Sequence, residues 1–172
     1  NKYCKADPKN KELASYFEIE IKLGNKYYAY GYEVVLSTGQ FQTEWLIELT
    51  SDNKEKVIFE RDIVNGIYEL DGCLKTKEVY NKINNYAEDI QDDEKALLLT
   101  VMNRNKKNFY QKYKSAAILQ DIYFWMKENL DINYPDRPIS NYSYMANLEN
   151  VEEVCNMIAA FGTGITNYQL VE

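Results

Sequence analysis

The stretch that decides the fold is residues 16–35, which read YFEIEIKLGNKYYAYGYEVV. Apolar residues at the odd positions of 17–23 alternate with charged residues, and this period of two is typical of a half-buried strand. Gly24-Asn25 follows, and such a pair favours a tight turn because both residues tolerate a positive φ. The stretch therefore predicts two antiparallel strands joined as a hairpin.

The second strand of this hairpin has two unlike faces. Tyr28, Tyr30 and Tyr32 share one face, whereas Ala29 and Gly31 lie on the other. Small residues in a strand indicate that something packs closely against that side. Tyrosine combines a wide apolar ring with a polar hydroxyl, so a row of tyrosines is also typical of a partner-binding surface. The three tyrosines are therefore a candidate interaction face.

Two more strands are expected after the hairpin. Residues 41–49 alternate, with Trp45 on the predicted apolar face and Glu44 on the opposite, polar face. A short strand over 57–59 follows and ends near Arg61. The connections are short, and short connections between successive strands favour an antiparallel meander.

From about residue 75 the apolar spacing changes to three or four, which predicts a helix with Val79 and Ile83 on its buried face. Three further helices are expected. One begins at the acidic pair 92–93, one covers 109–130, and one begins at Asn150, with Glu153 in a capping-box arrangement. Gly162 is expected to end the last helix, because glycine is the usual residue just beyond a helix. An extended segment from Gly164 to Leu170 follows.

These patterns together predict an α+β fold. An N-terminal antiparallel meander of about four strands is followed by a helical lobe of about four helices and a final short strand. The expected domains are an antiparallel β subdomain with a lead-in loop over 1–70 and a helical insertion lobe over 71–140. A terminal helix and strand over 141–172 would continue into a longer chain.

The charge balance argues against a nucleic-acid partner for this segment. The net charge is −7, and nucleic-acid binding usually needs a basic stripe that meets phosphates. A local basic cluster does exist, and we interpret it as a solvated helix face; its members are Lys106, Lys107, Lys112 and Lys114.

The cysteines and the apolar runs indicate a reduced, cytoplasmic setting. Cys4, Cys73 and Cys155 are far apart, so they have no metal-ligand spacing, and an odd number argues against a disulfide framework. No apolar run approaches the roughly 20 residues that cross a bilayer, and no signal peptide is recognisable. Asn1 stands where an initiator Met is usual and Glu172 ends the chain without a polar tail, so an excised fragment is expected.

Histidine is absent, which excludes several kinds of catalytic site. Ser-His-Asp catalysis, Cys-His catalysis and histidine-based metal sites are all ruled out. Acidic residues that remain available for a metal gather before the second expected helix, where helix capping explains them better; they are Asp89, Asp92, Asp93 and Glu94.

A hydrolase that uses paired strand carboxylates is a further hypothesis. Glycoside hydrolysis needs two carboxylates across a cleft, and several glutamates lie on the expected strands. They are Glu18, Glu20, Glu33, Glu44 and Glu48. Alternation alone places them on a solvated face, and nothing in the sequence marks a pair with a raised pKa.

Nucleotide chemistry lacks its usual motifs in this chain. The Walker A pattern does not occur. Gly162-Thr163-Gly164 follows a helix, whereas a dinucleotide fingerprint needs a strand, a turn and then a helix. Asp93-Glu94 precedes its apolar run, whereas a Walker B pair ends one. The sequence therefore assigns no catalytic, cofactor-binding or metal-binding residue.

The sheet residues resemble a family of ATPases. The stretches YFEIEI (16–21), YAYGYEV (28–34), TEWL (43–46) and IFER (58–61) stand in order. This order resembles the region after Walker A in bacterial AAA/ABC-type ATP-binding proteins related to the OLD and abortive-infection ATPases. A looser likeness extends over 116–171, through a helix with an aromatic pair and a late Gly-Ile strand start.

The resemblance implies an ATPase head with an antiparallel β subdomain followed by a helical insertion. The implied parent hydrolyses ATP with Mg in step with head dimerisation, in phage defence or DNA-related processes, beside an effector such as a nuclease or toxin. Its Walker A would lie before Asn1, and its signature and Walker B motifs beyond Glu172, so this chain is expected to be inactive alone. The implied partners are the rest of the same chain and a second copy.

Two expectations about residues accompany this resemblance. Glu44 and Arg61 are a candidate structural ion pair that fixes the sheet, although an exposed pair would contribute little. The alternative to the ATPase fragment is a stand-alone interaction module that binds through Tyr28, Tyr30 and Tyr32.

Overall fold

The computed structural model describes residues 3–50, 54–70, 76–130 and 147–168. The chain forms two compact units, Asn1–Glu128 and Asn129–Glu172. The first unit contains the sheet and most of the helices, and the second contains a helix near the C-terminus.

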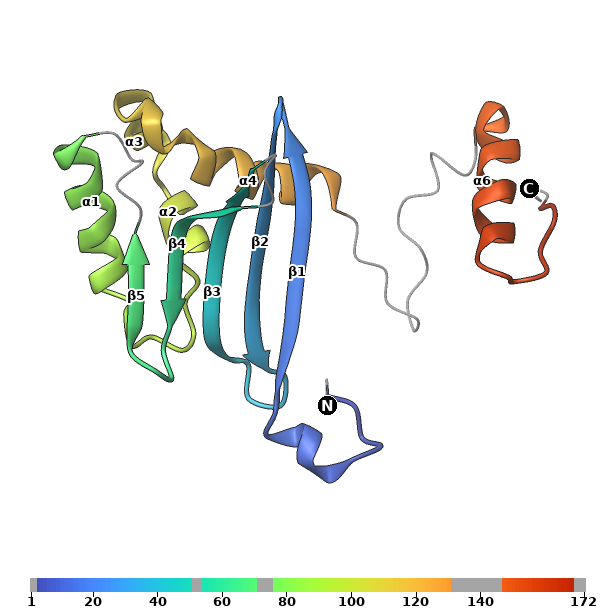
Figure 1. Cartoon of the computed structure of the whole chain (residues 1–172), viewed down its shortest axis with the longest axis horizontal. Coiled ribbons are helices and arrows are strands. Elements are labelled where there is room, and N and C mark those ends of the chain that lie inside the picture. The colour runs from blue at the N-terminus through green and yellow to red at the C-terminus, as the bar shows by residue number, and fades with distance from the viewer. Residues whose placement is uncertain (1–2, 51–53, 71–75, 131–146, 169–172) are drawn as a thin grey trace. The chain divides into compact units, whose positions relative to one another are not determined.

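The first unit is built on a five-stranded antiparallel sheet in which each strand pairs with the next along the chain (Figure 1). The strands are β1 (Ala14–Leu23), β2 (Lys26–Val35), β3 (Gln40–Leu49), β4 (Glu55–Asp62) and β5 (Ile67–Leu70). The predicted α+β class and meander are therefore confirmed, with a fifth strand where about four were expected.

The fifth strand escaped the sequence pattern because it is only four residues long. Its pairing with β4 rests on the turn between them. Gly66 has φ +65°, and the side chain of Asp62 accepts hydrogen bonds from the backbone and side chain of Asn65. Four residues show too little alternation to predict a strand without this partner.

The helices follow the sheet in sequence. They are α1 (Lys77–Glu88), α2 (Leu98–Asn103), α3 (Lys107–Lys112), α4 (Ala117–Asn129) and α6 (Val151–Ala160), with short 3₁₀ turns at Pro8–Lys11, Lys114–Ala116 and Leu148–Asn150. Helix α1 matches its prediction: Val79 and Ile83 are buried, and the side chain of Thr76 caps its first turn.

Two predicted helices differ from the observed ones, one in its start and one in its continuity. The second helix begins at Leu98 instead of at the acidic pair 92–93, whose neighbourhood forms turns. The helix predicted over 109–130 is broken at Tyr113, where φ −113° and ψ 69° are not helical. Acidic residues favour helix starts but also favour turns, so the pattern alone does not separate the two.

The C-terminal helix α6 begins after Asn150 as predicted, although the Asn150 side chain makes no capping hydrogen bond. Gly162 follows the helix with φ +68°, and its N–H donates to the carbonyl of Ala159, as expected of the residue just beyond a helix end. The predicted final strand is not formed over 163–168, and its remainder lies outside the described residues.

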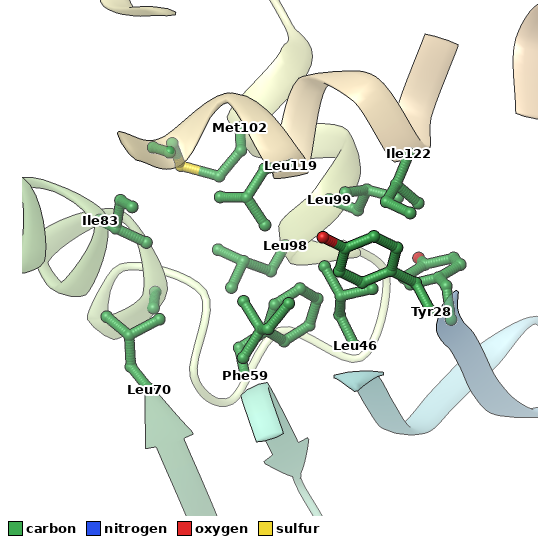
Figure 2. Close-up of a cluster of buried hydrophobic side chains, with 14 of the residues drawn as sticks. Tyr28, Leu46, Phe59, Leu70, Ile83, Leu98, Leu99, Met102, Leu119 and Ile122 are labelled. Carbon is green, nitrogen blue, oxygen red and sulfur yellow. The ribbon is translucent and has the colours of Figure 1, made fainter. Parts of the chain in front are cut away.

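The core of the first unit lies between one face of the sheet and the helices. Figure 2 shows side chains from the strands pointing toward side chains from α2 and α4. The central residues are almost fully buried: Leu46, Phe59, Ile83, Leu98, Leu99, Met102, Leu119 and Ile122. The predicted boundary at residue 70 therefore falls inside one compact unit, while the boundary at residue 140 lies outside the described residues.

The predicted faces of β3 are reversed. Leu46 pairs with Tyr30, so Glu44 and Leu46 point into the core, and Trp45 lies on the opposite face. A shift in the β3–β4 pairing after Leu46 lets Ile58 and Phe59 both reach the core. The sequence pattern predicted that Glu44 faces solvent because it is charged. In the structure Glu44 shares the core-facing side of β3 with Leu46 and is buried.

Candidate functional site

Two regions of the first unit combine polar chemistry with an unusual environment. One is a buried cluster around Glu44, and the other is the face of the sheet that the core does not use.

The predicted ion pair between Glu44 and Arg61 forms, and it is buried. The two residues lie directly opposite each other on β3 and β4. The Nη2 atom of Arg61 is 3.6 Å from the Oε2 atom of Glu44, and their side chains are 1% and 0% exposed. A buried pair behaves differently from the exposed pair that the sequence suggested, because removing one member strands a charge away from water.

The carboxylate of Glu44 receives hydrogen bonds from the start of helix α2. The backbone N–H of Leu98 donates to Oε2 at 2.6 Å, and that of Leu99 donates to Oε1 at 3.1 Å. The hydroxyl of Tyr30 also donates to Oε1 at 3.0 Å. Leu97, at the N-cap position, provides no capping side chain, so Glu44 from the sheet does this instead.

The guanidinium of Arg61 holds the segment that leads into α2. Its Nη1 donates to the carbonyls of Ile90 at 2.6 Å and Asp93 at 3.3 Å, and its Nη2 donates to the carbonyl of Ala96. Arg61 therefore ties the segment between α1 and α2 to the sheet, and Glu44 ties the helix that follows.

Burial raises the pKa of Glu44, while the amides of Leu99 and Leu98, the charge of Arg61 and the Tyr30 hydroxyl all lower it. Burial and the Glu44 charge raise the pKa of Tyr30 well above 10.0, so this hydroxyl remains a hydrogen-bond donor. Because the cluster is buried, a solute cannot contact it. Its role is to hold α2 and the segment between α1 and α2 in place.

The predicted interaction face does not lie on the surface. Tyr28 and Tyr30 are only 6% and 4% exposed, and Tyr32 is half-buried. Figure 2 shows Tyr28 within the core cluster, near Leu46. The rings contribute to the core that the helices cover, so Tyr28 and Tyr30 do not present an exposed binding surface.

The opposite face of the sheet is open. Tyr16, Glu18 and Glu20 on β1 are exposed, and no helix of the first unit covers this side in Figure 1. The close packing predicted beside Ala29 and Gly31 is present, because the Trp45 ring lies against the backbone of Gly31.

The strand carboxylates of the hydrolase hypothesis do not converge. Glu44 is in the core, and Glu48 is paired with Lys26 at 2.6 Å. On the open face, Glu18 accepts from the indole of Trp45 at 2.7 Å, and Glu33 accepts from the hydroxyl of Thr43. No described set of three or more Asp, Glu or Cys residues forms a metal-binding group.

Two of the acidic residues before α2, Asp93 and Glu94, make side-chain hydrogen bonds. The Asp93 side chain accepts a hydrogen bond from the backbone N–H of Lys95, and Glu94 accepts one from the Gln40 side chain. The first contact lies within the turns between α1 and α2, and the second links these turns to the first residue of β3. They agree with a structural interpretation of the cluster, although they belong to turns instead of to a helix start.

A cavity of about 650 Å³ lies among α1, α2, α3 and α4. Amide and aromatic side chains line it, including Asn103, Asn105 and Phe109, and the ammonium of Lys106 lies 3.8 Å from the ring centroid of Tyr86. In the basic cluster predicted from the sequence, Lys112 also has a partner, in Glu78 at 3.0 Å.

The open face contains residues that sequence reasoning missed. The alternation over residues 17–23 predicted that Glu18 and Glu20 share a face. The strand register shows that Trp45, Glu60 and Glu69 lie on the same face of the sheet, which the sequence pattern did not reveal. Gly31 was the available signal, because a glycine inside a strand often marks the close approach of a large side chain.

Comparisons with protein-family models, with curated proteins and with solved structures gave no match to this chain. In the part of the chain that the structure describes, no helix combines the length and the apolar character needed to cross a membrane.

Proposed function

We propose that this chain is the β subdomain and helical lobe of an ABC/SMC-like ATPase head of the OLD and abortive-infection group. The catalytic motifs of such a head, Walker A, the signature and Walker B, would be provided by other segments of a longer protein. The proposal extends to a cytoplasmic protein that uses ATP and Mg in phage defence or a DNA-related process.

The observation that carries this proposal is the way in which the motif stretches meet. The stretches 16–21, 28–34, 43–46 and 58–61 lie on four successive strands, β1 to β4. Two of their charged members, Glu44 and Arg61, are neighbours in the core, where Glu44 holds α2 and Arg61 holds the segment that leads into it. Residues scattered over the sequence thus build one structural unit, and this supports the interpretation of the stretches as one motif set.

In this proposal the segment has a mechanical role. The sheet, the loop after α1 and helix α2 are joined by Glu44 and Arg61, so the lobe can move with the sheet as one body. Such a body could pass a change at the nucleotide site to a second head or to an effector.

The complete reading frame provides the first test. We expect it to encode a Walker A motif before Asn1 and a Walker B motif beyond Glu172. The purified full-length product should hydrolyse ATP, and replacing the Walker A lysine with alanine should abolish turnover. A reading frame without these motifs, or a full-length product with no ATP turnover, would overturn the proposal.

The alternative, an interaction module that binds through Tyr28, Tyr30 and Tyr32, loses its support because two of these tyrosines are buried in the core. The open face of the sheet is a different candidate surface for an interaction.

A further inference from the structure

One cross-strand row defines the open face. It runs over all five strands through Glu18, Gly31, Trp45, Glu60 and Glu69, each paired with the next in the register. The tryptophan lies at the centre of the row, and carboxylates lie toward both ends. Neighbouring rows add further carboxylates, Glu20 and Glu33.

Aromatic rings lie at the centre of this face. The Tyr16 and Trp45 ring centroids are 5.1 Å apart, and Tyr16 is 59% exposed. The Trp45 indole N–H donates to Glu18 at 2.7 Å, which fixes the ring beside a carboxylate. The arrangement presents an aromatic surface and an anionic group side by side to solvent.

The charges on this face act on one another. Local desolvation, a hydrogen bond with Glu18 and the charges of Glu18, Glu33 and Glu20 raise the pKa of Tyr16 to about 12. Glu60 and Glu69 are directly opposed in the β4–β5 register, and like charges so placed destabilise a sheet. Within the described strands, Lys22 is the only cation that the register places on this face.

We propose that the open face of the sheet docks a lysine- and arginine-rich segment of a protein partner. Nucleic acid is excluded because phosphates would meet carboxylates, and two copies meeting through this face would repel each other in the same way. An arginine can pair with Glu18 or Glu20 while its planar group stacks on Tyr16, a combination that suits guanidinium better than ammonium. This inference does not depend on the ATPase proposal.

Intrinsic fluorescence gives a direct test, because the chain has two tryptophans and one lies at the centre of the face. In a Trp125→Phe background of the full chain, Trp45 is the sole reporter. Titration with a nona-arginine peptide should change the Trp45 emission, and the affinity should fall as NaCl is raised. A nona-lysine peptide should bind more weakly, and Tyr16→Ala should reduce that difference.

Matched charge variants distinguish peptide binding at this face from nonspecific attraction by the overall negative charge of the chain. The face variant combines Glu18→Gln, Glu20→Gln and Glu69→Gln. The control combines Glu12→Gln, Asp92→Asn and Glu128→Gln, which are exposed residues off the sheet with the same change in charge. We expect about tenfold weaker binding for the face variant and less than about twofold for the control, with both folded by circular dichroism.

Two results would overturn the proposal. One is an equal loss of affinity in the face and control variants, which would mean that net charge alone attracts the peptide. The other is a Trp45 emission that nona-arginine leaves unchanged at low salt.

Discussion

At the scale of single residues, Glu44 and Gly31 show how position changes the meaning of a side chain. Glu44 is charged and buried, and it acts as the capping group of a helix far away in sequence. Gly31 is small because Trp45 occupies the space that a side chain would need. Both are explained by contacts with residues distant in the sequence, and neither is explained by its immediate neighbours.

Breaking the buried pair should destabilise the fold strongly. Arg61→Met leaves Glu44 buried without its cation, and we expect a loss of about 3–5 kcal/mol in the free energy of unfolding, measured in urea. Glu44→Gln should also destabilise. In the double variant the total loss should be smaller than the sum of the single losses, because the stranded charge is gone. Additive losses would mean that the pair is not coupled.

Adding a methyl group at Gly31 should disturb Trp45. A Cβ atom there would lie 2.6 Å from Cε2 of Trp45 and 2.7 Å from the carbonyl oxygen of Phe17. We expect Gly31→Ala to cost about 1–3 kcal/mol and to shift the tryptophan emission to longer wavelength. In a Trp45→Phe background the cost should be smaller, and an unchanged cost would point to the backbone contact instead.

At the scale of elements, short helices and strands in this protein depend on partners. Helix α2 has six residues and no capping side chain of its own, and the segment before it is held by Arg61. Strand β5 has four residues and exists by pairing with β4. In each case the stabilising contact comes from an element earlier in the chain.

The β4–β5 pair carries an electrostatic cost that can be measured. Glu60 and Glu69 are cross-strand neighbours of like charge. We therefore expect Glu69→Gln to raise the free energy of unfolding by about 0.5 kcal/mol at low ionic strength. The gain should shrink in 0.5 M NaCl, because salt screens exposed charges. Glu69→Asp keeps the charge and serves as the control, and an equal gain from it would contradict the electrostatic cause.

At the scale of the whole molecule, buried tyrosines make the stability of the first unit depend strongly on pH in the alkaline range. Burial raises the pKa of Tyr30, Tyr68 and Tyr110 above 10.0. The unfolded chain releases these protons at a lower pH than the folded chain does. Stability from these groups is therefore present below pH 10.0 and is lost as the pH rises toward the folded pKa values.

The free energy of unfolding should consequently fall above pH 10.0, by up to about 1.4 kcal/mol per pH unit for each such phenol. Urea unfolding across this range measures the slope, and Tyr110→Phe or Tyr68→Phe should each reduce it. Below pH 9 these variants should differ. The Tyr110 hydroxyl donates to the carbonyl of Met102 at 3.0 Å, so its removal should cost about 1 kcal/mol.

Tyr68 is the matched control for that loss. Its buried hydroxyl has no hydrogen-bond partner in the described structure, so Tyr68→Phe should be neutral or slightly stabilising. A large loss of stability from Tyr68→Phe would show that its hydroxyl has a partner after all.

The sequence by itself determined the α+β class, the hairpin at Gly24, the first helix and the absence of histidine chemistry. These features depend on local alternation, turn residues and composition, which are visible within a few neighbouring residues. It also predicted that Glu44 and Arg61 would pair, although that expectation came with the family resemblance.

Only the tertiary structure decided which face of the sheet is covered. A strand with apolar or aromatic residues on both sides does not reveal which side meets the helices, because a shift of one residue in register exchanges the faces. The register puts Tyr28, Tyr30 and Glu44 on one face and Tyr16, Glu18 and Trp45 on the other. The helices cover the first face, so the second remains open. Burial, and with it the choice of candidate surface, depends on pairing between distant residues.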